Sequence, residues 1–134
     1  MSVNVLIKNK TADYIFYLGV VRELEIIPDD EMDIPLAGPG DRIYLSFDRC
    51  ENPTQVRTFG LGEGVLEYSV DPVSEQATFS VLMGPAPAGP QETPAPTFYV
   101  SGDTTGAGQD NWTRGLELNL HGSGVNQITL SITE

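Results

Sequence analysis

Apolar and polar residues alternate along most of this chain with a period of two. The closing run, residues 127–133, places Ile128, Leu130 and Ile132 on one side and polar residues on the other. Side chains of a β-strand point alternately to opposite faces, so this pattern predicts strands with one buried and one solvated face. The same alternation recurs in residues 3–8, 32–36, 43–47, 65–70 and 77–83.

Turn signals separate these runs at intervals of about 8–12 residues, as expected for an all-β fold. We predict one domain over residues 1–134, an antiparallel β-sandwich, jelly-roll-like or similar, of about ten short strands, with a closed barrel as the alternative. Pro35 places the run 32–36 at a sheet edge, because proline has no backbone N–H to donate. Residues 14–21 are predicted to form one strand, and a short strand at 55–59 is expected to end at Gly60. The runs 116–120 and 127–133 are expected to pair as a hairpin.

Two segments interrupt the alternation. Residues 85–96 hold five of the ten prolines and predict an extended surface loop, either a crossover between sheets or a docking segment. Residues 102–115 form a second predicted loop, which holds the single tryptophan.

The charge balance limits the classes of partner that we expect this protein to bind. Nineteen acidic against seven basic residues give a formal net charge of −12, which excludes nucleic acid and simple adsorption to anionic membranes. Neutral sugars, zwitterionic lipids, cations and basic surfaces remain as partners. No apolar run approaches the roughly 20 residues of a transmembrane helix. The N-terminal residues lack a secretion signal, which predicts a cytoplasmic protein or one released by another route.

Residues suited to catalysis are scarce. The chain has one histidine, His121, one cysteine, Cys50, and no phosphate-binding or metalloprotease motif. We therefore expect a protein that is not an enzyme. A hydrolase that uses a pair of carboxylates is the last of three functional hypotheses.

The loop 102–115 is the predicted binding site. Asn111, Trp112 and Arg114 bring an amide, an indole and a guanidinium together, and Asp103 and Asp110 bracket two glycines. A sugar can stack on an indole while amide and charged groups bond its hydroxyls, and a choline headgroup is attracted to an aromatic face. The alternative is structural: Trp112 closes the end of the sandwich and Arg114 pairs with a carboxylate. Asp103 and Asp110 are also the candidate ligands of a calcium ion.

Aromatic residues on both faces of the run 14–21 suggest a second kind of function. Tyr14 and Phe16 point one way and Tyr17 the other, so one face should expose aromatic surface or meet a partner. A self-assembling β protein that forms homo-oligomers is therefore the alternative to a lectin-like or toxin-like binding module.

Four segments resemble the aegerolysins, small acidic all-β proteins that bind membrane lipids. They are residues 3–9, 64–72, 98–102 and 122–124. The resemblance implies the sandwich fold. The chain lacks the family's tryptophan-rich segment near its Cys-Pro, so no binding residue is carried over.

Overall fold

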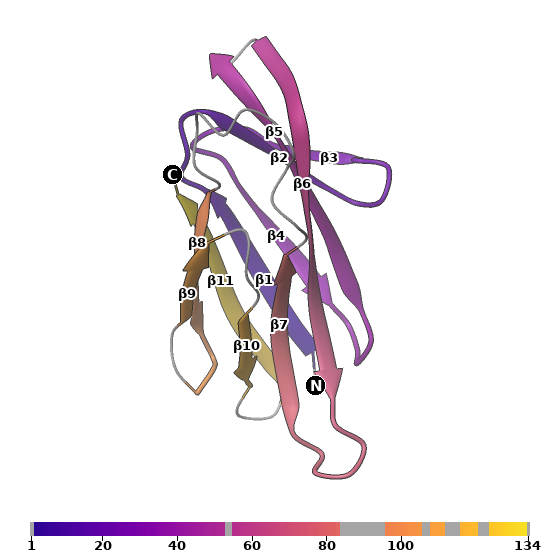
Figure 1. Ribbon diagram of the computed structural model, residues 1–134. Coiled ribbons are helices and arrows are strands. Elements are labelled where there is room, and N and C mark those ends of the chain that lie inside the picture. Colours follow the sequence, from indigo (N-terminus) through magenta and orange to yellow (C-terminus); the bar gives the residue numbers. More distant parts are fainter. Residues whose placement is uncertain are drawn as a thin grey trace.

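The computed structural model is a sandwich of two β-sheets packed face to face (Figure 1). It describes the backbone of residues 2–52, 55–83, 96–105, 108–111, 116–120 and 124–133, and their side chains except at 49–52, 55–63, 82, 83 and 108–111. No helix occurs among these residues. The predicted all-β sandwich is confirmed.

Eleven strands form the described part of the two sheets. They are β1 (Ser2–Asn9), β2 (Tyr14–Leu18), β3 (Leu24–Ile26), β4 (Glu31–Leu36), β5 (Arg42–Asn52), β6 (Gln55–Val70), β7 (Ala77–Met83), β8 (Thr97–Gly102), β9 (Gly108–Asn111), β10 (Leu116–Asn119) and β11 (Val125–Thr133). The five-stranded sheet has the order β4-β1-β11-β8-β9, and the six-stranded sheet has the order β10-β7-β6-β5-β2-β3.

One strand pair differs from the antiparallel expectation. β1 and β11 run parallel, from Ser2 opposite Val125 to Asn9 opposite Ile132, so the five-stranded sheet is mixed. The predicted hairpin of residues 116–120 with 127–133 is wrong. β10 pairs with β7 in the six-stranded sheet, whereas β11 lies in the other sheet between β1 and β8.

The inward faces of both sheets supply one core. Every second residue of β1 is buried, as the alternation predicted, and β11 follows the same rule. Burial of apolar surface on this scale is the main force that holds the sheets together. The core includes Val3, Val5, Ile7, Phe16, Leu45, Leu66, Tyr68, Phe79, Val81, Phe98, Val100, Ile128, Leu130 and Ile132.

Two predicted strand boundaries were wrong. β2 ends at Leu18, because Gly19 and Arg22 adopt positive φ angles of 98° and 57° in the turn that leads to β3. β6 continues through the glycines at 60, 62 and 64 to a length of 16 residues. Glycine weakens a strand, but pairing with β5 and β7 holds this one.

The sheet edges are short or blunted. β4 is an edge strand, and Pro35 lies within it, as predicted. The other edge strands, β3, β9 and β10, have three or four residues each. Such edges offer few backbone groups for pairing with another chain. Within the described residues no helix has the length and apolarity needed to span a membrane.

The aromatic residues of β2 are covered. Tyr14 and Phe16 lie in the core beside Phe47. On the opposite face, Ile15 is buried and the Tyr17 ring lies beneath the Arg22 guanidinium, 3.7 Å from its centroid. The exposed aromatic surface that the sequence suggested for this strand does not occur.

A buried asparagine joins the two sheets. Asn9, at the end of β1, donates its side-chain amide to the backbone oxygens of Tyr14 and Ile26, each at 2.9 Å. Its side-chain oxygen accepts hydrogen bonds from the backbone N–H and the hydroxyl of Thr11, at 3.0 and 2.6 Å. Since β1 lies in one sheet and β2 and β3 in the other, these bonds fix the two sheets relative to each other.

Candidate functional site

A polar hollow of about 340 Å³ lies on the solvent-facing side of the six-stranded sheet. Its residues come from the end of β6, the β6–β7 turn, β7 and β10. Seven of the eight lining residues are polar or charged, and the lining consists of Ser69, Val70, Asp71, Ser74, Gln76, Thr78, Glu117 and Asn119.

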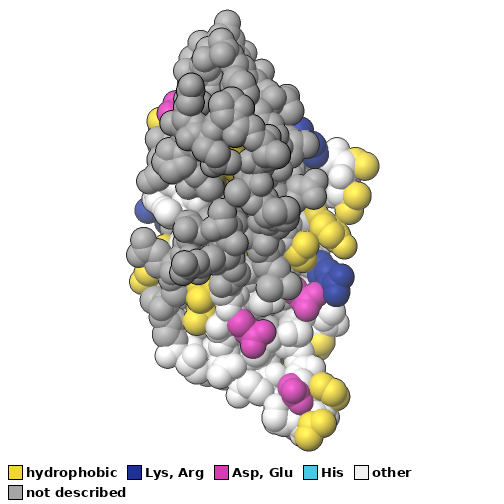
Figure 2. Space-filling model, viewed as in Figure 1, with side chains coloured by type: hydrophobic (Ala, Val, Ile, Leu, Met, Phe, Trp, Pro, Cys, Tyr) yellow, Lys and Arg dark blue, Asp and Glu magenta, His cyan; other side chains and the backbone are white. Residues whose placement is uncertain are grey.

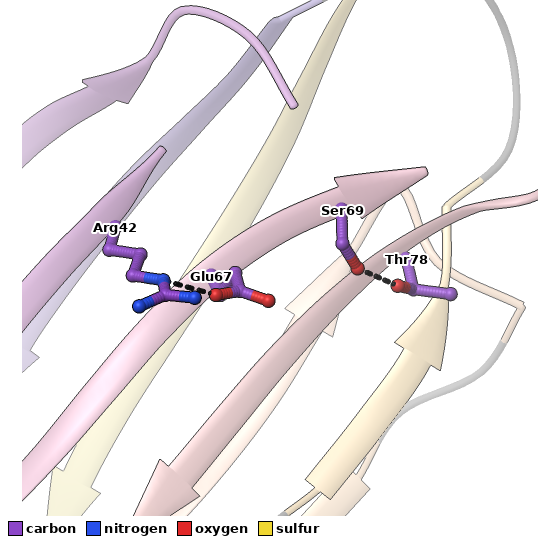
Figure 3. Close-up of polar contacts among 4 residues, drawn as sticks. All are labelled: Arg42, Glu67, Ser69 and Thr78. Atoms are coloured by element: carbon purple, nitrogen blue, oxygen red, sulfur yellow. Dashed lines mark hydrogen bonds and ion pairs between the residues drawn. The ribbon is translucent and has the colours of Figure 1, made fainter. Parts of the chain in front are cut away.

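The floor of the hollow is a row of side chains across three strands. Thr78 on β7 pairs with Ser69 on β6 and with Asn119 on β10, so the three side chains lie about 4.8 Å apart on one face. The Ser69 and Thr78 hydroxyls are hydrogen-bonded at 2.7 Å (Figure 3). The floor thus presents two hydroxyls and one amide in a fixed line.

One wall of the hollow is the β6–β7 turn, which Asp71 organises. The Asp71 carboxylate accepts hydrogen bonds from the backbone N–H groups of Val73 and Ser74, at 2.8 and 2.9 Å. These bonds, the one from Ser74 first, lower the pKa of the Asp71 carboxyl below its usual value. Asp71 is therefore a fixed negative charge at neutral pH.

Gln76 ties this turn to β10. Its amide nitrogen donates to the backbone oxygens of Ala77, at 2.9 Å, and Leu120, at 3.2 Å. Leu120 in turn donates its N–H to the oxygen of Ala77 at 2.9 Å. The two sides of the hollow are thereby held at a fixed separation, and its shape is set before any ligand binds.

The adjacent row on the same face carries an ion pair. Glu67 on β6 lies two residues from Ser69, so both side chains point to the same side, and Figure 3 shows Arg42 on β5 bonded to Glu67 next to the Ser69–Thr78 contact. The hydrogen bond with Glu67 raises the pKa of Arg42 above its usual value. Arg42 is thus engaged with its own carboxylate partner.

The surface around the β6–β7 turn carries scattered charged side chains. Figure 2 shows acidic and basic side chains there as separate spots among uncharged side chains and backbone. The hollow contributes two carboxylates, Asp71 and Glu117, and its described lining contains no basic side chain. The local charge is negative, in agreement with the net charge of −12.

Of the predicted site residues, Asp103 has a structural role. Its carboxylate accepts a hydrogen bond from the Gln127 N–H at 2.8 Å, and its own N–H donates to the Gln127 oxygen at 2.9 Å. Asp103 therefore caps the contact of β8 with β11. The neighbouring Thr105 donates its N–H to the oxygen of Asn119 at 2.9 Å, which brings the start of the predicted loop beside the hollow.

The predicted loop 102–115 contains a strand. Asp110 and Asn111 lie in β9, where they pair with Phe98 and Thr97 of β8. The expectation of an uninterrupted loop was wrong, since β9 adds an edge to the five-stranded sheet. Trp112, Arg114 and His121 lie outside the described residues, as does most of the segment 85–96. The predicted roles of Trp112 and Arg114 stay predictions.

The register between β8 and β9 tests the prediction that Asp103 and Asp110 bind one calcium ion. Asp110 pairs with Phe98, whereas Asp103 follows Gly102 at the other end of β8, and four residues of strand span about 13 Å. Calcium ligands lie about 2.3–2.6 Å from the ion, so the register argues against one ion shared by both carboxylates. In the described part of the chain no group of three or more acidic, histidine or cysteine side chains is arranged to hold a metal.

A second polar cluster lies on the same sheet, at β2 and β5. The guanidinium of Arg22 contacts the carboxylate of Asp48 at 2.8 Å, and Asp48 is 4% exposed. Asp48 Oδ1, Ser46 Oγ and two nitrogens of Arg22 are buried without a hydrogen bond of good geometry. This cluster anchors the β2–β3 turn.

The hollow was not predicted from the sequence. The alternation predicts that Glu67 and Ser69 point outward from their strand. It predicts the same for every polar residue of an alternating run, so it does not single out these two as part of a site. Ser69 and Asn119 are 50 positions apart, and only the pairing of β6 and β10 with β7 brings them together. The position of the β6–β7 turn beside β10 likewise depends on strand order.

Comparison of the chain with models of known protein families, with curated proteins and with solved structures finds no match. The resemblance to the aegerolysins stays a prediction. The geometry and chemistry of the hollow are the basis of the function proposed below.

Proposed function

We propose that this protein is a non-enzymatic carbohydrate-binding module whose ligand occupies the polar hollow. The observation that carries the proposal is the row of Ser69, Thr78 and Asn119 beside the turn that Asp71 organises. A volume of about 340 Å³ is near the lower end of the range for small-ligand sites, roughly 300–1,000 Å³. It suits one or two sugar rings.

The chemistry of the lining supports a ligand rich in hydroxyl groups. A hydroxyl both donates and accepts a hydrogen bond, and it therefore needs partners of both kinds. Ser69 and Thr78 offer hydroxyls, Asn119 an amide, and Asp71 and Glu117 carboxylate acceptors. The turn and β10 are held by hydrogen bonds, so binding orders little of the protein.

A lipid headgroup fits this lining less well. Recognition of a choline group relies on aromatic faces around the cation, and none of the described lining residues is aromatic. Trp112 stays the predicted stacking partner of a sugar ring. The predicted ligand class narrows from sugar or lipid headgroup to sugar.

The other two hypotheses have less support. Open-ended self-assembly needs accessible edges, and the described edge strands are short or contain Pro35. A carboxylate-pair hydrolase needs one acid whose pKa is raised so that it can donate a proton. In the hollow, the pKa of Asp71 is shifted in the opposite direction.

A glycan array followed by calorimetric titration of the best binders tests the proposal. The informative variant is Asn119→Ala, and its matched control is Asn4→Ala, which removes a partly exposed asparagine from the other sheet. Loss of one or two hydrogen bonds to the ligand predicts a Kd about tenfold weaker for Asn119→Ala and unchanged for Asn4→Ala.

Trp112→Ala separates the hollow from the predicted loop. If both Trp112→Ala and Asn119→Ala weaken binding, the two form one site. If only Trp112→Ala does, the ligand sits in the loop and the hollow is not the site. Absence of any bound glycan overturns the carbohydrate proposal.

A further inference from the structure

We infer that the sugar bound in the hollow carries a protonated amine, which makes its ligand class amino sugars with free amino groups. The inference rests on the proposed carbohydrate function and specifies its ligand. It follows from the charges that face the hollow and from the positions of the basic side chains around it.

The hollow places two negative charges at its edge, with no basic side chain among its described lining residues. Asp71 lies at the turn and Glu117 on β10. Neither residue takes part in the described ion pairs, which join Arg22 to Asp48 and Arg42 to Glu67. Asp71 and Glu117 lie on opposite sides of the Ser69–Thr78–Asn119 row, so each carboxylate would pair with its own positively charged group of the ligand.

The other described basic side chains do not neutralise this site. Arg42 is bonded to Glu67 in the adjacent row (Figure 3), and Arg22 is engaged with Asp48 and the Tyr17 ring near the opposite edge of the sheet. Lys8 lies on β1 of the other sheet, where it pairs with Glu31 and Ser131, and Lys10 directly follows β1. The net charge of −12 adds a long-range attraction for cations.

The floor specifies the rest of the ligand. A simple metal cation would need six or more oxygen ligands or a tight carboxylate cluster, and no such cluster occurs in the described chain. The Ser69 and Thr78 hydroxyls and the Asn119 amide instead suit neutral hydroxyl groups next to the charge. A cation that also carries several hydroxyls is an amino sugar.

Calorimetry with a matched pair of disaccharides tests the inference. The probes are the β-1,4-linked disaccharide of glucosamine and its di-N-acetyl form, both at about pH 6, where the free amines are protonated. Charge-assisted bonds are about twice as strong as neutral ones, so the free-amine form should bind about threefold to tenfold more tightly at low salt. Ionic strength near 1 M should remove most of this preference.

Glu117→Gln and Glu25→Gln form the variant pair. Both glutamates are exposed on edge strands of the same sheet, β10 and β3, and the substitution keeps side-chain size. Glu117→Gln should reduce the preference for the free amine to within about twofold, and Glu25→Gln should leave it unchanged. Equal loss in both variants would assign the preference to overall charge and overturn the inference.

The two proposals fail in different ways. If the acetylated disaccharide binds as tightly as the free-amine form, the amino-sugar inference is wrong and the carbohydrate function stands. If other saccharides bind and neither of these two does, the inference also fails. If no saccharide binds, both proposals are overturned. Circular dichroism of each variant confirms that the fold is intact.

Discussion

The substitution Asn9→Ala should be among the most destabilising single changes at a polar position. Asn9 is 1% exposed and makes four side-chain hydrogen bonds, two as donor to Tyr14 and Ile26 and two as acceptor from Thr11. The two bonds that Asn9 donates connect β1 of one sheet to β2 and β3 of the other. Alanine removes all four and leaves the methylene of the side chain in place.

The magnitude follows from the number of bonds. A buried hydrogen bond contributes about 0.5–1.5 kcal/mol, so four bonds correspond to about 2–6 kcal/mol. The oxygen of Tyr14 also accepts from the Thr11 hydroxyl at 3.2 Å, and a water can enter a polar gap of this size. We therefore expect a loss of about 3 kcal/mol in the free energy of unfolding, roughly a hundredfold in the folded-to-unfolded ratio.

Urea unfolding followed by far-UV circular dichroism measures this loss. The matched control is Asn4→Ala on the same strand, since the Asn4 side chain faces outward and bonds the side chains of Asp33 and Gln127. The control should lose less than about 1 kcal/mol, with an unchanged slope in urea. An Asn9→Ala protein within about 1 kcal/mol of wild type, or equal to the control, would refute the role of Asn9 between the sheets.

Three further predictions concern other parts of the fold. Gly102→Ala places a Cβ atom 2.2 Å from the backbone oxygen of Gln127 at a φ of +119°, so the variant should lose more than about 2 kcal/mol of unfolding free energy. The control Gly40→Ala also has a positive φ but open space around the new Cβ atom, and it should lose only about 1–2 kcal/mol. Equal losses in thermal unfolding would contradict the close approach of β8 to β11. Arg22→Met leaves the buried Asp48 carboxylate without its cation and should lose about 2–4 kcal/mol of unfolding free energy. Arg42→Met breaks an exposed ion pair and should lose less than about 1 kcal/mol. Urea unfolding of both variants measures the two losses, and equal losses would contradict the difference in burial. The Asp71 carboxyl has a lowered pKa, so its contribution to stability is present at neutral pH and is lost as the pH falls below about 4 through the folded-state pKa. Asp71→Asn should therefore be less stable than wild type at pH 7. A stability difference that persists at the lowest pH would contradict the assignment of this stability to the Asp71 charge.

The alternation of polar and apolar residues was sufficient to predict the class of the fold. It identified the buried faces of β1 and β11 and the outward side of β6, and proline identified β4 as an edge strand. These features depend on each residue and its near neighbours in the sequence, which is why a period of two reveals them.

The alternation could not predict which strands pair with each other. An alternating run carries no information on which strand lies beside it or in which direction, so the parallel pairing of β1 with β11 and the separation of β10 from β11 could not be derived. The continuous β6 was missed because three glycines suggested a break. In the structure, pairing with two neighbouring strands outweighs the weak strand preference of glycine.

The hollow was missed by the sequence analysis for the same reason. Residues with conspicuous chemistry, such as Trp112 and Arg114, attracted the prediction, whereas the hollow is built of ordinary outward-facing polar residues on three strands. Asn9 illustrates the same limit, since its bonds to Tyr14 and Ile26 depend on the packing of the two sheets. Both features became visible only with the tertiary structure.

Chemical-shift mapping on ¹⁵N-labelled protein tests the central claim most directly. The titrant is the saccharide that binds most tightly in the array, and the readout is the set of backbone amides that shift with a common Kd. Binding in the hollow predicts the largest shifts at Ser69, Ser74, Gln76, Thr78 and Asn119, with those of the five-stranded sheet unchanged. Shifts centred on other residues, or none with any saccharide, would contradict the proposed site.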